Sequence, residues 1–203
     1  MRTASSGRQL DPLQGYALVV AIGLGTVLLS PGVRLAAMWV AMLALGLIGL
    51  GLQQSSDELA LASLAGGSLV GIVLGAPVGV FLFRPLQGFS ERLYATSDPL
   101  LLFYQTSLVG ALAEELFFRG VLQPRRGLLV ATAAYAGIGL VYFAPHAPVL
   151  GIALAVACLA LLGTVYAYVR QHYGLAAAVV CHALAAFLMN VMPSLITSWQ
   201  GIL

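Results

Sequence analysis

The sequence predicts an all-α fold, a polytopic transmembrane helical bundle of seven to eight helices. Hydrophobic residues make up 61% of the 203 residues and charged residues only 8%, and the mean hydropathy is +0.99. A soluble domain carries about 25% charged residues, so this chain has too few polar side chains to cover a globule in water. Because the apolar stretches are joined by short connections, we expect residues 1–203 to form a single integral membrane domain.

A membrane-spanning helix needs about 20 predominantly apolar residues, and seven stretches of the chain qualify. In chain order these are 14–30, 35–52, 59–83, 99–122, 127–144, 149–169 and 174–199. The first resembles a signal peptide, but no small-residue cleavage pattern lies at its polar end, so we expect it to be retained as a helix. The third and the last are long enough to be broken or to contain a short extra segment, which leaves an eighth helix open.

The third stretch carries a glycine at every fourth position. The four residues are Gly67, Gly71, Gly75 and Gly79. Lipid provides no hydrophobic drive between helices, so close backbone approach supplies the packing, and glycine permits that approach. We favour packing inside the bundle over a dimer interface for this stripe, and we expect Pro77 to kink the helix.

The longest polar connection runs from Arg84 to Asp98, and it alternates charged and apolar residues. That pattern is typical of a short amphipathic helix lying at the membrane interface. Ser97 or Asp98, just before Pro99, is suited to cap the next helix. The functional alternative for this connection is a substrate gate beside a site.

Charge and cysteine content limit the function further. The net charge is +2 and all nine basic residues are arginine, with no basic face suited to nucleic acid. With the N-terminus inside, five arginines lie on the cytoplasmic side against Arg34, Arg84 and Arg92 outside, which mildly favours that orientation. Cys158 and Cys181 both lie in apolar runs, so we expect buried free thiols rather than a disulfide framework.

Three ionisable side chains lie inside the fourth apolar stretch, at Glu114, Glu115 and Arg119. Each costs roughly 2.5–3.5 kcal/mol at bilayer depth, so we expect a polar site in the protein interior. Residues four apart share a helix face, which lets Glu115 pair with Arg119. Glu114 points about 100° away and is free to act on water as a general base. The alternative is a structural salt bridge between helices, which the second glutamate makes less favoured.

Two histidines lie in later apolar stretches. His146 stands between two prolines, which suggests a helix end where backbone is freed inside the protein. His182 lies well inside the last stretch. A lone intramembrane histidine is often a hydrogen-bonded packing residue, but beside two carboxylates we expect both histidines to converge with Glu114 on a water molecule or a metal ion.

Three features together resemble the CPBP family. They are the Glu-Glu-x-x-x-Arg motif, an aromatic residue three positions before His146, and the later His182. The family comprises the intramembrane CAAX-prenyl-protease-like and bacteriocin-processing proteins, also called Rce1-like or Abi. The resemblance covers about residues 85–199. It implies an eight-helix bundle in a bacterial inner (cytoplasmic) membrane, with a cavity open to the membrane and the cytosol. It also implies hydrolysis of a peptide bond in a membrane-anchored protein or peptide, near its C-terminus or beside its membrane segment.

The resemblance further implies a role for each residue. Glu114 matches the glutamate that activates the attacking water, with Glu115 and Arg119 in support, and His146 and His182 match the histidines that position that water or bind a metal. One alternative is zinc, held by Glu114, His146 and His182 with a water in the fourth position. The other is a metal-free site in which histidine and a side-chain amide hold the oxyanion.

Two positions depart from the family pattern. Tyr142 stands where the family often has phenylalanine, which retains an aromatic ring. Ala186 stands four residues after His182, where the family usually has asparagine. Asn190 would lie about 12 Å along the axis of a regular helix and about 80° around it, so we expect it not to share one small ligand with His182.

We therefore expect an intramembrane endopeptidase. The first alternative is a binding or immunity protein of the same family that keeps the bundle without turnover, which Ala186 favours. The second alternative is a small transporter with Glu114 and Glu115 as proton carriers. The sequence contains no internal repeat or paired broken helices of the kind that transporters have, which weighs against it.

Overall fold

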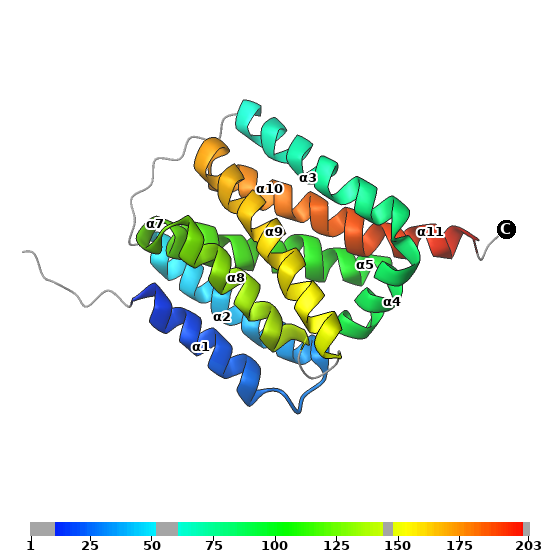
Figure 1. The fold of residues 1–203 in the computed structure, drawn as a ribbon, viewed down its shortest axis with the longest axis horizontal. Coiled ribbons are helices and arrows are strands. Elements are labelled where there is room, and N and C mark those ends of the chain that lie inside the picture. The colour runs from blue at the N-terminus through cyan, green and yellow to red at the C-terminus, as the bar shows by residue number, and fades with distance from the viewer. Residues whose placement is uncertain (1–10, 52–60, 144–147, 201–203) are drawn as a thin grey trace, which may run out of the picture.

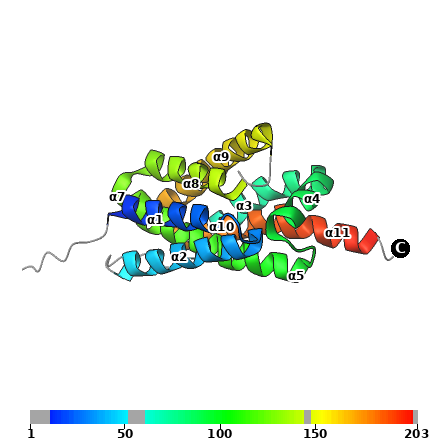
Figure 2. The ribbon, with the colours of Figure 1, turned by 90° about the horizontal axis from the view of Figure 1, so that it is seen from below.

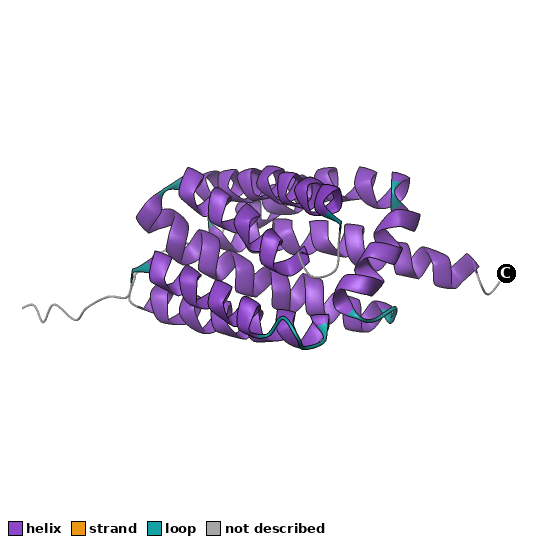
Figure 3. Cartoon of the chain, turned by 60° about the horizontal axis from the view of Figure 1, so that its bottom comes forward, coloured by secondary structure: helices purple, strands orange, loops and turns teal. Residues whose placement is uncertain are grey.

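The computed structural model describes residues 11–51, 61–143 and 148–200, and within these ranges all regular secondary structure is helical (Figure 3). The first part of the chain forms α1 (Pro12–Gly25), α2 (Pro31–Gly51), α3 (Leu61–Phe81) and α4 (Phe83–Tyr94). A long fifth helix joins α5 (Pro99–Leu102), the π-helical η1 (Phe103–Gly110), α6 (Ala111–Glu114), the π-helical η2 (Glu115–Leu122) and α7 (Gln123–Arg126). α8 (Leu128–Phe143) and α9 (Val149–Tyr173) follow. The last helix joins α10 (Leu175–Ala186), the π-helical η3 (Phe187–Val191) and α11 (Met192–Gln200).

The predicted bundle of seven to eight transmembrane helices is confirmed, with eight continuous helices in the described residues. Five are long and apolar enough to cross a membrane, namely 31–51, 62–81, 99–126, 149–173 and 175–198. α1 and α8 are apolar but shorter, with 14 and 16 residues. Large apolar side chains such as Leu150 and Leu161 are exposed on the outer faces of the helices. So much exposed apolar surface is stable only against lipid, so the chain is an integral membrane protein.

The eighth helix is α4, the amphipathic connection that the sequence predicts. Its Ser90 and Leu93 are buried against the bundle, whereas Arg84 and Arg92 are exposed. The predicted cap of the next helix is also confirmed, because the Asp98 carboxylate accepts a 2.8 Å hydrogen bond from the N–H of Leu100.

The glycine stripe of α3 packs against the last helix, and the two run side by side in Figure 1. A Cβ atom added at Gly71 would lie 2.5 Å from the main-chain oxygen of Cys181, and one added at Gly75 would lie 3.0 Å from the Cα of Ala185. Hence the stripe packs inside the bundle, as expected, and α3 continues through Pro77 as far as Phe81.

Two expectations about single residues were wrong. Arg34, which the charge count placed among the outer connections, is fully buried near the start of α2 and donates a 2.7 Å hydrogen bond to the main-chain oxygen of Tyr142. That oxygen belongs to the last turn of α8, where a cation also offsets the helix dipole. Cys158 and Cys181 are both free, but only Cys181 is buried, because Cys158 lies on an exposed part of α9.

α1 is tied to the far end of the fifth helix by Asp11. Its carboxylate pairs with Arg126 and accepts a 3.0 Å hydrogen bond from the N–H of Leu13, which caps α1. The hydrogen bond from Arg126 and then that from Leu13 hold the pKa of Asp11 below its ordinary value. The pair is exposed, so it orients α1 more than it stabilises the bundle.

The fifth helix packs closely against α2 and α10, and this contact positions the site. A Cβ atom added at Gly46 of α2 would lie 2.9 Å from the Cβ of Leu116, so the glycine lets the two backbones approach. Figure 2 shows α8 and α9 on one side of the bundle, α2 on the other and α10 between them. The polar residues of the fifth helix are therefore surrounded by protein rather than by lipid.

The packing of α3 can be tested by replacing Gly71 with alanine. The new methyl group would meet the backbone of α10, which cannot move aside as a side chain can, so we expect Gly71→Ala to lower stability by about 1–3 kcal/mol. The measurement is the midpoint of thermal unfolding of the purified protein in detergent. Gly25→Ala is the matched control, since nothing lies within 4 Å of its added Cβ and alanine favours helix. Equal midpoints for the two variants would contradict this account of the stripe.

Candidate active site

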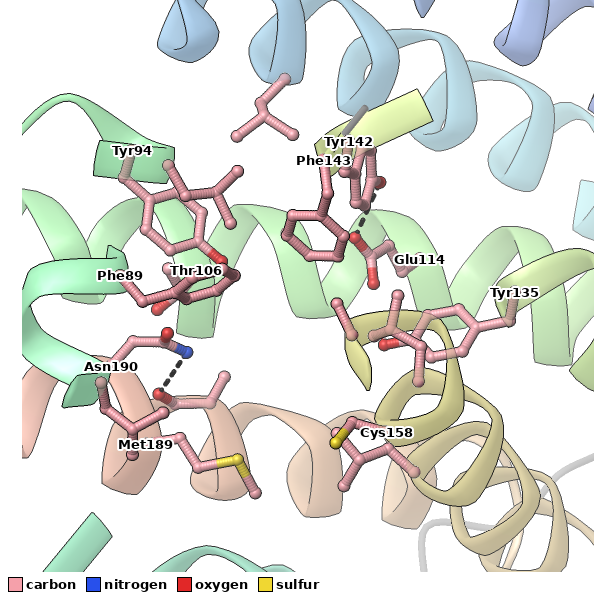
Figure 4. Close-up of a pocket in the computed structure, with 18 of the residues that line it drawn as sticks. Phe89, Tyr94, Thr106, Glu114, Tyr135, Tyr142, Phe143, Cys158, Met189 and Asn190 are labelled. Atoms are coloured by element: carbon pink, nitrogen blue, oxygen red, sulfur yellow. Dashed lines mark hydrogen bonds between the residues drawn. The ribbon is translucent and has the colours of Figure 1, made fainter. Parts of the chain in front are cut away.

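Glu114 is the last residue of α6, near the middle of the fifth helix, and its side chain is buried. Its Oε1 atom accepts a 3.0 Å hydrogen bond from the indole N–H of Trp39. The same oxygen accepts a 2.9 Å hydrogen bond from the hydroxyl of Tyr142 (Figure 4). A buried carboxylate is stable only when donors satisfy it. These two donors, from α2 and α8, fix one oxygen and orient the other.

The second oxygen, Oε2, lies 3.9 Å from Nε2 of His182 on α10. This distance is too long for a hydrogen bond. A water molecule can contact both atoms at once, because a bridging water spans gaps of this size. Glu114 and His182 therefore offer two polar atoms that a single water molecule beside them can bridge.

Glu115 holds the other side of the same imidazole. Its Oε1 lies 2.9 Å from Nδ1 of His182, and Nη1 of Arg119 approaches the same oxygen at 3.4 Å. A carboxylate beside an arginine only accepts hydrogen bonds, so Nδ1 carries the proton that is donated to Glu115. The Nε2 atom of a neutral ring then presents its lone pair toward Glu114.

Aromatic rings enclose the buried charges. Tyr166 stacks on the His182 ring, with ring centroids 4.4 Å apart, and the Arg119 guanidinium lies 4.2 Å from the centre of the Tyr135 ring. Arg119 also donates a 3.0 Å hydrogen bond from Nη2 to the main-chain oxygen of Gly163. Stacking and the cation–π contact hold both groups in one orientation.

The elements that carry these residues approach one another where a glycine leaves space. A Cβ atom added at Gly110 would lie 3.0 Å from the ring of Trp39, and one added at Gly163 would lie 2.8 Å from the ring of Tyr135. Larger residues there would push away the rings that hold Glu114 and Arg119.

The Glu114–His182 pair faces a cavity of about 500 Å³, a size typical of small-ligand sites. The rest of its lining is mainly apolar and aromatic, from α2, α4, the fifth helix, α8, α9 and the last helix (Figure 4). Among the described residues, the exposed part of the lining lies on or beside two helices. It consists of Phe89 and Arg92 on α4, and of Leu154 and Cys158 on α9 with Pro148 just before it. The cavity therefore opens between α4 and α9.

The structure brings together four of the five predicted site residues: Glu114, Glu115, Arg119 and His182. The fifth, His146, lies outside the described residues. Within the ranges that the structure describes, no group of three or more His, Cys, Asp or Glu side chains is arranged to hold a metal ion. The predicted zinc set therefore has two of its three ligands facing each other.

Sequence reasoning missed Trp39. A tryptophan in the middle of an apolar helix was the available signal for Trp39, because a buried indole N–H needs an acceptor. Asn190 lines the same cavity as Glu114 and His182. The chain is π-helical from Phe187 to Val191, so the angle given by a regular helix does not apply to Asn190.

A buried carboxylate and an imidazole that face one cavity within a transmembrane bundle are the arrangement expected of an intramembrane hydrolase. A family model described as type II CAAX prenyl endopeptidase Rce1-like matches residues 96–188, which contain Glu114, Glu115, Arg119 and His182. This match to a family of membrane proteases agrees with the resemblance seen in the motifs. No curated protein and no solved structure matches the chain.

The hydrogen bonds to Glu114 predict the effect of Tyr142→Phe. Loss of the hydroxyl leaves a buried carboxylate oxygen with one donor in place of two, so we expect a loss of about 1–3 kcal/mol in stability. Thermal unfolding in detergent checks this. Tyr104→Phe removes a hydroxyl from an exposed tyrosine and serves as the control. An unchanged midpoint for Tyr142→Phe would show that this hydrogen bond does not hold Glu114.

Proposed function

We propose that the chain is an intramembrane endopeptidase in which Glu114 is the general base. The observation that carries this proposal is the free Oε2 of Glu114, which faces Nε2 of His182 across 3.9 Å inside the cavity. Every other contact of the two residues serves to orient them. The match of residues 96–188 to a protease family supports peptide hydrolysis as the reaction.

The geometry suggests how water is activated. A water between the two side chains donates one hydrogen to Oε2 of Glu114 and the other to Nε2 of His182, so its lone pairs point into the cavity toward a peptide carbonyl. Glu114 takes the first proton as the water oxygen attacks the carbonyl carbon, and then passes that proton to the leaving amine. Glu115 and Arg119 do not touch the water in this scheme and act by fixing the imidazole.

The substrate class is inferred from the lining and the surroundings of the cavity. Its mouth between α4 and α9 opens from a bundle with an apolar outer surface, and its walls are mainly apolar. Such a cavity accepts the apolar end of a membrane-anchored protein or peptide, or the chain beside its membrane segment. We place this reaction in a bacterial inner membrane.

A zinc site is the alternative to this metal-free scheme. A carboxylate oxygen and a neutral imidazole nitrogen are ordinary zinc ligands, so Glu114 and His182 fit two positions, and His146 would be the third. When bound there, zinc would polarise a water molecule. The contacts of Glu115, Trp39 and Tyr142 orient the two donors in the same way with or without the ion.

One observation favours a different function. Ala186 lines the cavity without a polar group, at the position where the resembling family has an amide. A bundle that lacks this group would bind a peptide without cleaving it, as a binding or immunity protein does. Cleavage assays separate the two functions.

The proposed base is tested with Glu114→Gln. Glutamine keeps the acceptor oxygen for Trp39 and Tyr142, so we expect the variant to insert and fold but to lose hydrolysis of a membrane-tethered peptide by about 10²–10⁴-fold. The measurement is product formation in proteoliposomes, followed by mass spectrometry. Glu91→Gln, which changes a glutamate of α4 that is hydrogen-bonded to Gln87, is the control. Wild-type rates in Glu114→Gln would refute the assignment.

The zinc proposal is tested by metal analysis. We expect about one zinc per purified chain and its loss in both His146→Ala and His182→Ala, because each removes a proposed ligand. Inductively coupled plasma mass spectrometry gives the stoichiometry. A zinc-free wild-type protein that hydrolyses peptide would contradict the zinc set and leave Glu114 as the base.

A further inference from the structure

A second polar position lies in the wall of the same cavity, away from Glu114. It is Asn190 on η3, which projects among apolar residues such as Met189 and Phe89 (Figure 4). We infer that Asn190, oriented by Ser90, is a subsite that binds a main-chain carbonyl of the substrate peptide, three to four residues from the bond that is cleaved. The link to a cleaved bond rests on the proposed function, whereas the binding of a peptide carbonyl does not.

The amide of Asn190 is held in one orientation. The Ser90 hydroxyl of α4 donates a 2.9 Å hydrogen bond to Oδ1, and Nδ2 donates a 3.0 Å hydrogen bond to the main-chain oxygen of Ala186. A main-chain oxygen only accepts, so the nitrogen must be the atom that faces Ala186. Ser90 is fully buried, so this anchoring hydrogen bond is made inside the protein.

One N–H of this amide remains for a ligand. Nδ2 carries two hydrogens, and the Ala186 oxygen uses one of them. Asn190 is only partly buried and lines the cavity. An apolar side chain would fill this wall at a lower desolvation cost, so packing alone gives no reason for a fixed amide here.

The ligand that fits is an extended peptide. Each residue of an extended chain presents a main-chain carbonyl that needs a donor when it leaves water, and the second N–H of Asn190 is such a donor. The apolar walls around it suit the side chains of a membrane-anchored substrate. A lipid ester also has carbonyl oxygens, and competition by added phospholipid distinguishes the two sources.

The spacing of the two polar positions gives the register. Asn190 follows His182 by eight residues, which is about 12 Å along a helix axis. An extended chain advances about 3.3 Å per residue, so a carbonyl at Asn190 lies three to four residues from a bond between Glu114 and His182. Asn190 lies on the π-helical η3 and lines the same cavity as His182.

The test measures peptide binding to the Glu114→Gln protein in detergent, so that no turnover is needed. The probe is a fluorescent ten-residue peptide of alternating leucine and alanine, with a series in which one amide at a time is replaced by an ester, a weaker acceptor. We expect Asn190→Asp and Asn190→Leu to weaken binding about two- to tenfold, the value of one hydrogen bond. Aspartate keeps the shape and the acceptor for Ser90 but has no N–H.

Gln123→Leu, which removes an amide bonded to the Ala167 oxygen outside the cavity, is the matched control and should bind as before.

The ester series and added phospholipid show whether Asn190 binds a peptide carbonyl or a lipid. They also test binding at Asn190 independently of peptide cleavage. When Asn190 is unchanged, an ester at one position of the peptide should weaken binding. In the Asn190 variants, an ester at that position should leave the affinity unchanged. Three outcomes would overturn the subsite. They are equal affinity in the Asn190 variants, an ester effect that does not depend on position, and no peptide binding at all. If only added phospholipid competes in an Asn190-dependent way, the ligand is lipid and the peptide proposal fails. Wild-type protein that binds in this way without hydrolysing the peptides would contradict the proposed protease activity and leave the subsite standing.

Discussion

Two adjacent carboxylates inside a membrane bundle are the constraint on which the rest of the structure depends. Neither Glu114 nor Glu115 is stable there without donors, and each takes them from different helices. Trp39 and Tyr142 bring α2 and α8 to Glu114, whereas His182 brings α10 to Glu115. The need to satisfy two neighbouring charges therefore draws four helices around one point.

The same contacts divide the work between the two glutamates. Glu115 is completely buried with Arg119 and fixes the imidazole, so it has no direct route to a substrate. Glu114 is held by one oxygen only, and its other oxygen faces the cavity beside His182. A site of this kind depends on rigid support, because a general base acts only when its geometry is maintained without water to reorganise around it. Arg34 adds to that support from a distance, since it binds the main-chain oxygen of the residue whose hydroxyl holds Glu114.

Departures from regular α-helix occur in or beside the segments that line the cavity. η2 begins at Glu115, η1 ends at Gly110 beside Trp39, and η3 contains Asn190. π-helical turns often mark functional sites. Asn190 and His182 both line this one cavity. The cavity therefore has two separate polar positions, Glu114 with His182 and Asn190 with Ser90.

The sequence by itself determined the all-α membrane bundle, the amphipathic α4, the Asp98 cap and the packing of the glycine stripe. Each of these follows from hydropathy, from periodicity or from a short local pattern. It also drew attention to Glu114, Glu115, Arg119 and His182, because charge in an apolar stretch is costly enough to need a reason.

Only the tertiary structure decided which partners satisfy those charges. Trp39 lies 75 residues from Glu114 along the chain, and no local pattern connects them. The packing of the helices likewise decides that Arg34 is buried, that Cys158 is exposed and that Asn190 lines the cavity. The physical reason is that hydropathy and helix period act within a few residues, whereas hydrogen bonds between helices depend on a spatial arrangement that the whole bundle fixes.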